Sequence, residues 1–161
     1  MSERVSALEL AVGLEQGLYD RVFLEDWVDA EVAACERVEG PLLELTVLRD
    51  KSDHDIFEEL HALAGAQPSA GAQLAMEAHL VVACLGVMLE AGRISLASAV
   101  TRLRILTHET HELTPDECSV VYQLDDGYDL AASETYGTLE QVRADFLEFT
   151  ARYRHLLVGV R

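Results

Sequence analysis

The stretch "LVVACLGVML", residues 80–89, is the longest apolar run of the chain and decides its fold. Helical spacing extends this run in both directions into one predicted helix over about residues 72–91, apolar almost all round between Leu80 and Leu89. A helix that lacks a polar face is normally central and wrapped by other helices. The run is also about half as long as a bilayer-spanning helix needs to be. We therefore expect a central core helix and no membrane partner.

Helical spacing of apolar residues recurs from one end of the chain to the other, with short breaks at glycine or proline and hardly any strand signal. The sequence thus predicts an all-α protein. We expect a single-domain bundle, residues 1–161, of about six to eight helices around the apolar helix. "GAQPSAG", residues 65–71, is the best candidate for a linker between two helical halves. "VFLEDWV", residues 22–28, lines up with "ISLASAV", residues 94–100, as a weak repeat or as two similar helix starts.

Capping residues predict where several helices begin and end. "SDHD", residues 52–55, starts a helix with acids in its first turn, and Gly65 stands where that helix would stop. Ser95 is a candidate cap for the helix after the apolar one. "TPDE", residues 114–117, is a capping box with proline at the first helical position. "TLEQ", residues 138–141, begins the last helix in the same way.

The first third of the chain predicts three helices. Apolar spacing indicates helices over about residues 5–19 and 24–38, and Pro41 stands where the first turn of a third helix accepts proline. Trp27, beside Asp26 and Asp29, is interpreted first as a helix-packing residue and second as an anchor at an interface.

Acidic residues outnumber basic ones 29 to 12, which gives a formal net charge of −17. Nucleic acids and anionic membranes bind through basic surfaces, so we expect neither as a direct partner. The charge fits a basic protein partner, because complementary potentials raise association rates, and it equally fits a solvated surface that keeps the protein soluble. The candidate partner-binding residues form two acidic clusters and one anchor: Asp53, Asp55, Glu58 and Glu59; Asp125, Asp126 and Asp129; and Trp27.

The histidines give only weak metal signals. "HETH", residues 108–111, is one residue short of the HExxH pattern of zinc metalloproteases. On a helix, His108 and His111 would share one side, but no third ligand is identifiable, and a connector before the next helix explains them as well. "EELH", residues 58–61, is a single ExxH where a di-iron bundle needs two. His79 in the apolar helix is interpreted as a core histidine satisfied by a neighbour rather than as a ligand or base. We expect no cofactor.

Cysteine spacing and the first residues bear on the cellular compartment. Cys35, Cys84 and Cys118 lie far apart and form no CxxC pair, which indicates neither a zinc ribbon nor a disulfide framework. "MSERVSALELAVG", residues 1–13, carries acids where a signal peptide has an apolar core. We therefore expect a cytoplasmic protein with reduced thiols.

Three blocks of the sequence resemble a family of uncharacterised small acidic helical proteins of bacteria. They are "GLYDRVFLEDWVDAEV" (17–32), "GPLLELTVLRDKSDHDIFEELHAL" (40–63) and "VVYQLDDGYDLAASETYGTLEQVRADFLEFTARYR" (120–154). The shared features fall on Trp27, on the turn at residues 41–45 and on the helix start at residues 136–140. Similar proteins often act as immunity proteins that neutralise toxins exchanged between cells. The resemblance implies a helical fold and a binding role, and it implies no catalytic residue.

Three classes of function remain open. The favoured one is a non-catalytic immunity or inhibitor protein that occludes a basic protein partner, such as a nuclease-type toxin. The first alternative is a scaffold or self-associating helical protein that buries part of its apolar helix. The second is a metal-dependent enzyme whose histidines meet on folding. No phosphate loop, nucleophile elbow or dinucleotide fingerprint supports an enzyme. The histidines that such a metal-dependent enzyme would use are His54, His61, His79, His108 and His111.

Overall fold

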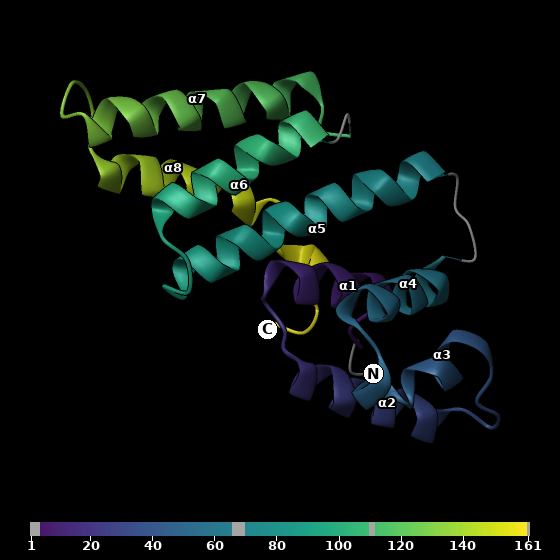
Figure 1. The fold of residues 1–161 in the computed structure, drawn as a ribbon. Helices are drawn as coiled ribbons and strands as arrows, with labels where there is room; N and C mark the ends of the chain where they lie inside the picture. Colours follow the sequence, from purple (N-terminus) through teal and green to yellow (C-terminus); the bar gives the residue numbers. More distant parts are fainter. Residues whose placement is uncertain (1–3, 66–69, 110–111, 161) are drawn as a thin grey trace. The chain divides into compact units, whose positions relative to one another are not determined.

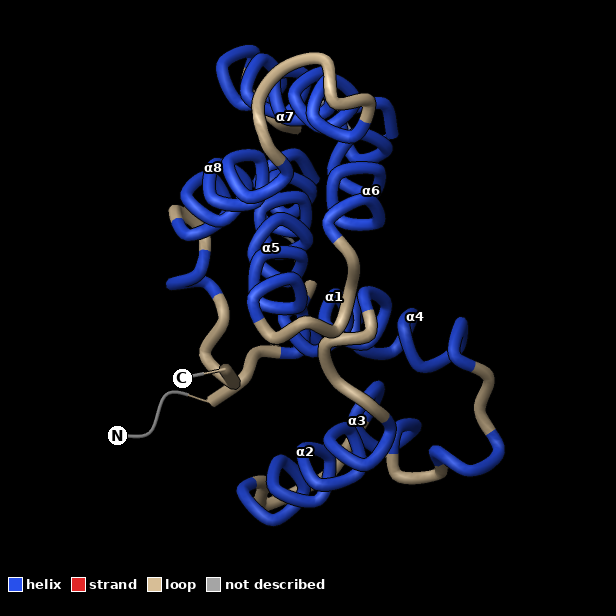
Figure 2. Tube along the Cα trace, turned by 90° about the vertical axis from the view of Figure 1, so that its left-hand side faces the viewer, coloured by secondary structure: helices blue, strands red, loops and turns tan. Residues whose placement is uncertain are grey.

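The structure is a computed structural model that describes residues 4–65, 70–109 and 112–160. This part of the chain is all-α, as predicted, and contains eight α-helices, two short 3-10 helices and no strand (Figures 1 and 2). The elements are α1 (Ala7–Gln16), α2 (Arg21–Ala34), α3 (Gly40–Leu45), η1 (Leu48–Asp50), α4 (Asp53–Ala64), α5 (Ala70–Glu90), α6 (Leu96–Glu109), α7 (Pro115–Ala132), α8 (Leu139–Ala151) and η2 (Arg154–Leu156).

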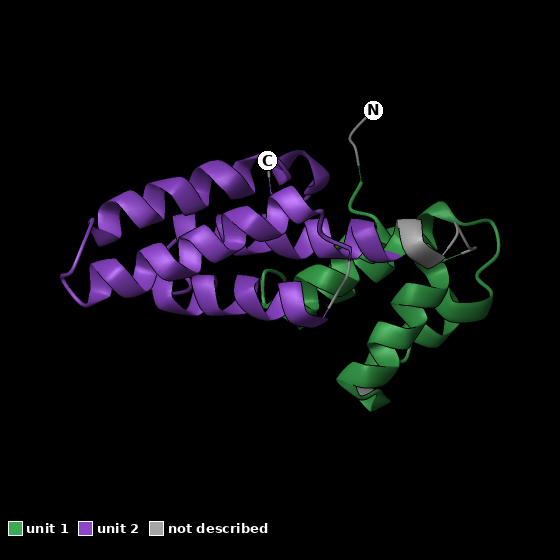
Figure 3. Ribbon diagram, turned by 90° about the horizontal axis from the view of Figure 1, so that it is seen from above, with its two compact units in different colours: residues 1–73 green, residues 74–161 purple. Residues whose placement is uncertain are grey.

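The chain divides into two compact units, residues 1–73 and 74–161 (Figure 3). Unit 1 contains α1 to α4, and unit 2 contains α6 to α8 and nearly all of α5. The predicted linker at residues 65–71 lies just before this division, but residues 66–69 are outside the described part of the chain. The expectation of a single domain stays a prediction.

Unit 2 is a bundle in which α5 to α8 run side by side (Figures 1 and 2). The predicted central apolar helix is confirmed as α5, which is buried along most of its length. One side of α5 packs into a core shared with the other three helices, as expected for helices that cover an apolar neighbour. The buried side chains of this core include Leu85, Leu89, Leu103, Phe146 and Phe149.

In unit 1, α4 lies against both α1 and α3, and α2 lies against α3. Each helix contributes buried aliphatic side chains at helical spacing, which is what holds short helices in place when their own propensity is marginal. These side chains include Leu10, Leu24, Val28, Leu45, Ile56 and Leu60.

The predicted caps are confirmed at the starts of four helices. Ser52 and Thr114 each form a complete capping box, with Asp55 and Glu117 as the returning acids. The hydroxyls of Ser95 and Thr138 accept hydrogen bonds from the backbone N–H groups three residues on. The starting point of each of these helices is therefore specified by residues that lie within one helical turn of each other.

Two predicted boundaries in unit 1 were wrong by a few residues. The helix expected over residues 5–19 ends at Gln16, because Gly17 adopts a left-handed conformation (φ 80°) and its N–H caps the last turn. The helix expected over residues 24–38 begins at Arg21, where the Asp20 side chain accepts from the backbone N–H of Phe23, and it ends at Ala34.

The two segments of the weak repeat occupy different positions on their helices. Val22 lies in the first turn of α2, whereas Ile94 precedes Ser95, the residue that caps α6. The alignment at residues 22–28 and 94–100 therefore does not superimpose the two helix starts.

Candidate functional site

The first predicted acidic cluster lies on α4 in unit 1, and its first two members are engaged locally. Asp53 pairs with Arg21, with 2.6 Å between carboxylate oxygen and guanidinium nitrogen. Asp55 accepts a hydrogen bond from the Ser52 hydroxyl (2.6 Å) and another from the Ser52 backbone N–H (3.1 Å). These two hydrogen bonds, the hydroxyl first, lower the pKa of Asp55. Both carboxylates thus serve the start of α4.

The other two members of this cluster also have partners on their own chain. Glu58 lies 3.5 Å from the His54 ring one turn earlier. Glu59 lies 3.6 Å from Lys51 Nζ, which also approaches Glu44 at 3.2 Å. The hydrogen bond to Glu44 is the main cause that raises the pKa of Lys51. Two of the four carboxylates, Asp53 and Glu59, therefore have a cationic partner on the same chain.

The second predicted acidic cluster lies on α7 in unit 2, and its members have fewer ion pairs among the described residues than those of the α4 cluster. Asp125 is 3.5 Å from Arg104 of α6. Asp126 and Asp129 are exposed, and neither has an ion pair or side-chain hydrogen bond with the described residues. Gly127 does not interrupt α7, which continues to Ala132. These two aspartates therefore keep their charge available to solvent or to a partner.

Trp27 is confirmed as a packing residue. Its indole N–H donates to the backbone carbonyl of Val5 at 2.9 Å and so attaches α2 to the segment before α1. The half-buried ring lines a small depression together with Leu42 and Leu63. Whether Trp27 also anchors a partner stays a prediction.

Of the two histidines predicted as weak metal ligands, the structure describes only one. His108 is exposed in the last turn of α6, with its ring 6.3 Å from that of Tyr122, and His111 lies outside the described residues. Within residues 4–65, 70–109 and 112–160, no group of three or more histidine, cysteine or acidic side chains is placed to hold a metal ion.

A polar cluster that sequence reasoning had identified only in part lies in unit 2. His79 of α5 is satisfied by a neighbour, as predicted: its Nε2 is 3.0 Å from Glu117 Oε1. The Tyr153 hydroxyl donates to the same oxygen, and the His79 and Tyr153 rings stack with centroids 4.6 Å apart. The other oxygen, Oε2, accepts from the backbone N–H of Thr114 at 2.6 Å. The capping acid of α7 is thus also the partner of the core histidine.

This arrangement favours one protonation state for each of two groups. Burial raises the pKa of Glu117, but hydrogen bonds from Tyr153 and Thr114, together with the nearby His79, outweigh it and lower the pKa overall. Burial and the hydrogen bond to Glu117 raise the pKa of Tyr153 to about 12. At neutral pH the cluster therefore holds an ionised Glu117 and a neutral Tyr153.

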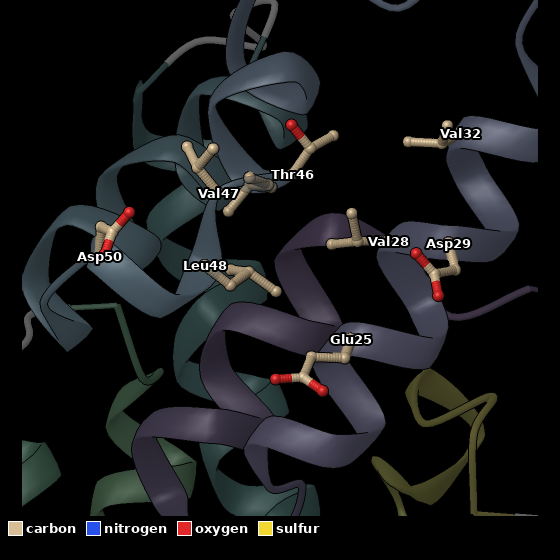
Figure 4. A pocket seen from close by; sticks show the side chains of 9 residues that line it. Glu25, Val28, Asp29, Val32, Thr46, Val47, Leu48 and Asp50 are labelled. Atoms are coloured by element: carbon tan, nitrogen blue, oxygen red, sulfur yellow. The ribbon is translucent and has the colours of Figure 1, made fainter.

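A groove in unit 1 was not predicted. It has a volume of about 570 Å³ and lies between α2 and the segment that runs from the end of α3 through η1 (Figure 4). Here it is called the α2–η1 groove. Its lining residues are Glu25, Val28, Asp29, Val32, Leu45, Thr46, Val47, Leu48 and Asp50.

The sequence of α2 contains a pattern that indicates one wall of the groove. Glu25, Val28, Asp29 and Val32 are spaced three and four residues apart, so they share one side of α2. That side alternates apolar and acidic residues. The opposite wall, with Val47, could not be anticipated because it depends on where the η1 segment folds back.

One stretch of α5, Gln73–Glu90, is long and apolar enough to cross a bilayer, judged over the described residues by length and composition. It is 56% buried inside the protein, and the core helix of a soluble protein passes the same criterion. The sequence-based estimate was shorter because it considered only the uninterrupted apolar run at residues 80–89. The absence of a membrane partner stays a prediction.

The chain is a small all-helical protein. No family model, no curated protein and no solved structure matches it. The resemblance to immunity-type proteins therefore stays a prediction.

Proposed function

We propose that this protein is a non-catalytic acidic binding protein, of the immunity or inhibitor type, that occludes a basic protein partner. The observation that carries the proposal is an unbalanced surface. Acids outnumber bases 29 to 12, and at least half of the twelve bases pair with acids of the same chain. Among the described residues, six bases pair with carboxylates of the same chain: Arg4, Arg21, Arg37, Lys51, Arg104 and Arg154.

The charge that remains is displayed on exposed positions. Asp126 and Asp129 of α7 have no counter-ion among the described residues, and the same holds for Glu25 and Asp29 of α2. Such carboxylates attract a basic protein over a distance of about a Debye length, which raises its association rate. Buried apolar contacts then set the lifetime of the complex. The resemblance of three sequence blocks to immunity proteins supports a toxin as the kind of partner.

Occlusion requires no reaction by this chain. Lysine and arginine side chains that line an active site on the partner would be covered by carboxylates and lose access to an anionic substrate. The α4 cluster is a further candidate surface for this role, and two of its carboxylates, Asp53 and Glu59, already pair with Arg21 and Lys51.

The test is affinity capture from a lysate of the native organism at low and high salt, followed by reconstitution with the captured protein after purification. We expect one stoichiometric basic protein whose association rate falls as salt rises, because the attraction is screened. A purified partner that associates at a rate independent of salt, or an empty eluate at both salt concentrations, would overturn the proposal.

Self-association is the second candidate, and one observation favours it. The first turns of α5 leave Leu74 and Met76 exposed to 46% and 42%. Contact between two copies would bury them, although the net charge of −17 opposes such contact at low salt. Analytical ultracentrifugation at high salt decides this, because a strictly monomeric protein at high concentration excludes it.

A further inference from the structure

The α2–η1 groove combines an apolar interior with an acidic border. Val28 and Leu45 are almost fully buried at its base, while Val47 is 52% exposed on one wall and Val32 is half-buried on the other. Figure 4 shows Val28, Val32 and Leu48 directed towards the space between the two walls. A volume of about 570 Å³ falls within the range of pockets that hold several apolar groups of a ligand.

Among the side chains that the structure describes, the border of the groove is negative. Glu25, Asp29 and Asp50 are exposed, and none has an ion pair or side-chain hydrogen bond with the residues that the structure describes. Glu25 and Asp29 stand one helical turn apart on α2, where like charges repel each other. A cation between them would relieve this repulsion.

The acids of this groove differ from those of the α4 cluster in their partners. On α4, Asp53 and Glu59 each have a basic partner from the same chain. No described basic side chain lines the α2–η1 groove. Among the described residues, these three carboxylates thus stand without a counter-ion beside a hollow with apolar walls, a combination that charge complementarity assigns to a basic partner.

We propose that the α2–η1 groove binds a basic amphipathic helix of a protein partner. Apolar side chains one turn apart enter between Val32 and Val47, and flanking arginines reach Glu25, Asp29 and Asp50. Arginine suits these positions because its guanidinium binds a carboxylate through two hydrogen bonds. This inference rests on the proposed function and names the surface and the partner chemistry for it.

Two other occupants fit less well. A second copy of this chain would bring net charge −17 against a border that is already negative. An extended peptide gains most of its affinity by adding to the edge of a sheet, and the described residues contain no strand. A helix needs only side-chain contacts, so it is the occupant that this groove accepts.

The test uses the full chain and a synthetic helical probe peptide. The probe carries leucines at i, i+3, i+4 and i+7 and arginines beside them, over about four helical turns. One control peptide has the same composition in scrambled order, and a second has glutamate in place of arginine. Affinity is measured by fluorescence anisotropy, and contact is located by NMR shifts of the Val28, Val32 and Val47 methyl groups.

Two matched triple variants separate the groove from diffuse charge. The groove variant E25Q/D29N/D50N and the control variant E134Q/E140Q/E148Q each remove three exposed carboxylates. We expect the groove variant to weaken probe binding by about tenfold or more, and the control by less than about twofold. Val47→Asn, at an exposed position, should weaken binding with no loss of charge.

The outcomes distinguish this inference from the proposed function. Equal weakening by the two triple variants, or equal binding of the scrambled peptide, overturns the groove while a salt-dependent captured partner still supports acidic binding. No binding of the probe to the unmodified protein, or methyl shifts that avoid all three valines, also overturns the groove. An unsuccessful capture experiment combined with selective probe binding would instead count against the occlusion proposal alone.

Discussion

Three polar contacts of unit 2 converge on the side chain of Glu117. Its Oε2 closes the capping box of α7, and its Oε1 meets both His79 of α5 and the Tyr153 hydroxyl after α8. A single carboxylate therefore connects three parts of the bundle. Hydrogen bonds to a charged group contribute more than neutral ones, and leaving a partly buried group without its donor is costly.

Tyr153→Phe is predicted to lower the free energy of unfolding by about 1–2 kcal/mol at neutral pH, because it removes the donor to ionised Glu117. The pKa of Glu117 is lowered from 4.5 in the folded state, so this contribution is present above pH 4.5 and is lost as pH falls through the folded value. Urea unfolding at several pH values should show the variant and the parent converging in acid. Tyr136→Phe is the control, since Tyr136 is exposed; an equal loss there would contradict the assignment.

Alkaline titration gives a second prediction for the same contact. The pKa of Tyr153 is raised from 10.0 to about 12, so its stabilising contribution is complete below pH 10 and is lost as pH rises towards 12. Ultraviolet absorbance should show a late-forming tyrosinate signal that is smaller by one tyrosine in Tyr153→Phe. A late-forming signal of unchanged size in the variant would assign the shift to another residue.

At the scale of the element, two glycines inside helices have opposite roles. A Cβ added to Gly86 of α5 would lie 2.3 Å from Thr150 Oγ1 and 2.6 Å from its Cβ, so the glycine permits α5 and α8 to approach. A Cβ added to Gly127 of α7 would meet only a Val142 methyl at 3.7 Å, an ordinary contact. The first glycine is therefore required by packing, and the second is only a weak point of its helix.

Alanine at these two positions should have effects of opposite sign. Gly86→Ala is expected to lower the free energy of unfolding by about 1–3 kcal/mol through overpacking. Gly127→Ala is expected to raise it by up to about 1 kcal/mol, because alanine loses less conformational entropy in a helix. Chemical denaturation of the two variants is the measurement. A Gly86→Ala protein with the same free energy of unfolding as its parent would contradict the packing argument.

The caps also belong to the scale of the element. Ser52→Ala removes the hydroxyl that accepts from Asp55 N–H, and it should lower the free energy of unfolding by about 1 kcal/mol. Ser119→Ala, at an exposed interior position of α7, is the matched control and should be neutral or slightly stabilising. Thermal unfolding of both variants tests this; equal effects would mean that the cap adds nothing beyond propensity.

For the whole molecule, net charge is the dominant physical feature. Seventeen excess acids repel one another, and the exposed ion pairs among the described residues, such as Arg21–Asp53, offset this only in part. Exposed pairs contribute about 0–1 kcal/mol each, so repulsion should outweigh them at low ionic strength. Screening is therefore expected to favour the folded chain.

Stability should consequently rise with salt. Raising NaCl from about 0.01 M to about 1 M shortens the Debye length from about 30 Å to about 3 Å and suppresses the repulsion. We expect a higher Tm at the higher salt concentration, measured by circular dichroism. A matched series in sucrose controls for general exclusion effects, and a Tm that falls with salt would show that ion pairs outweigh repulsion.

The sequence by itself determined the helical class, the buried central helix and most helix starts. Each of these depends on residues within a turn or two of each other, as at Ser52 and Thr114, or on the composition of one segment, as in α5. The boundary errors at Gly17 and Asp20 also have a local cause, because a capping residue sets the helix bound there although apolar spacing predicts another position.

Only the tertiary structure decided which charges are free. Sequence reasoning chose the α4 acids for their density, but Asp53 meets Arg21 from 32 positions away. His79 and Glu117 meet across 38 positions, and the α2–η1 groove exists only where the η1 segment returns to α2. Local patterns specify how each segment folds, whereas pairing of distant charges follows from helix packing. Packing depends on shape and burial over the whole unit, which no short stretch of sequence contains.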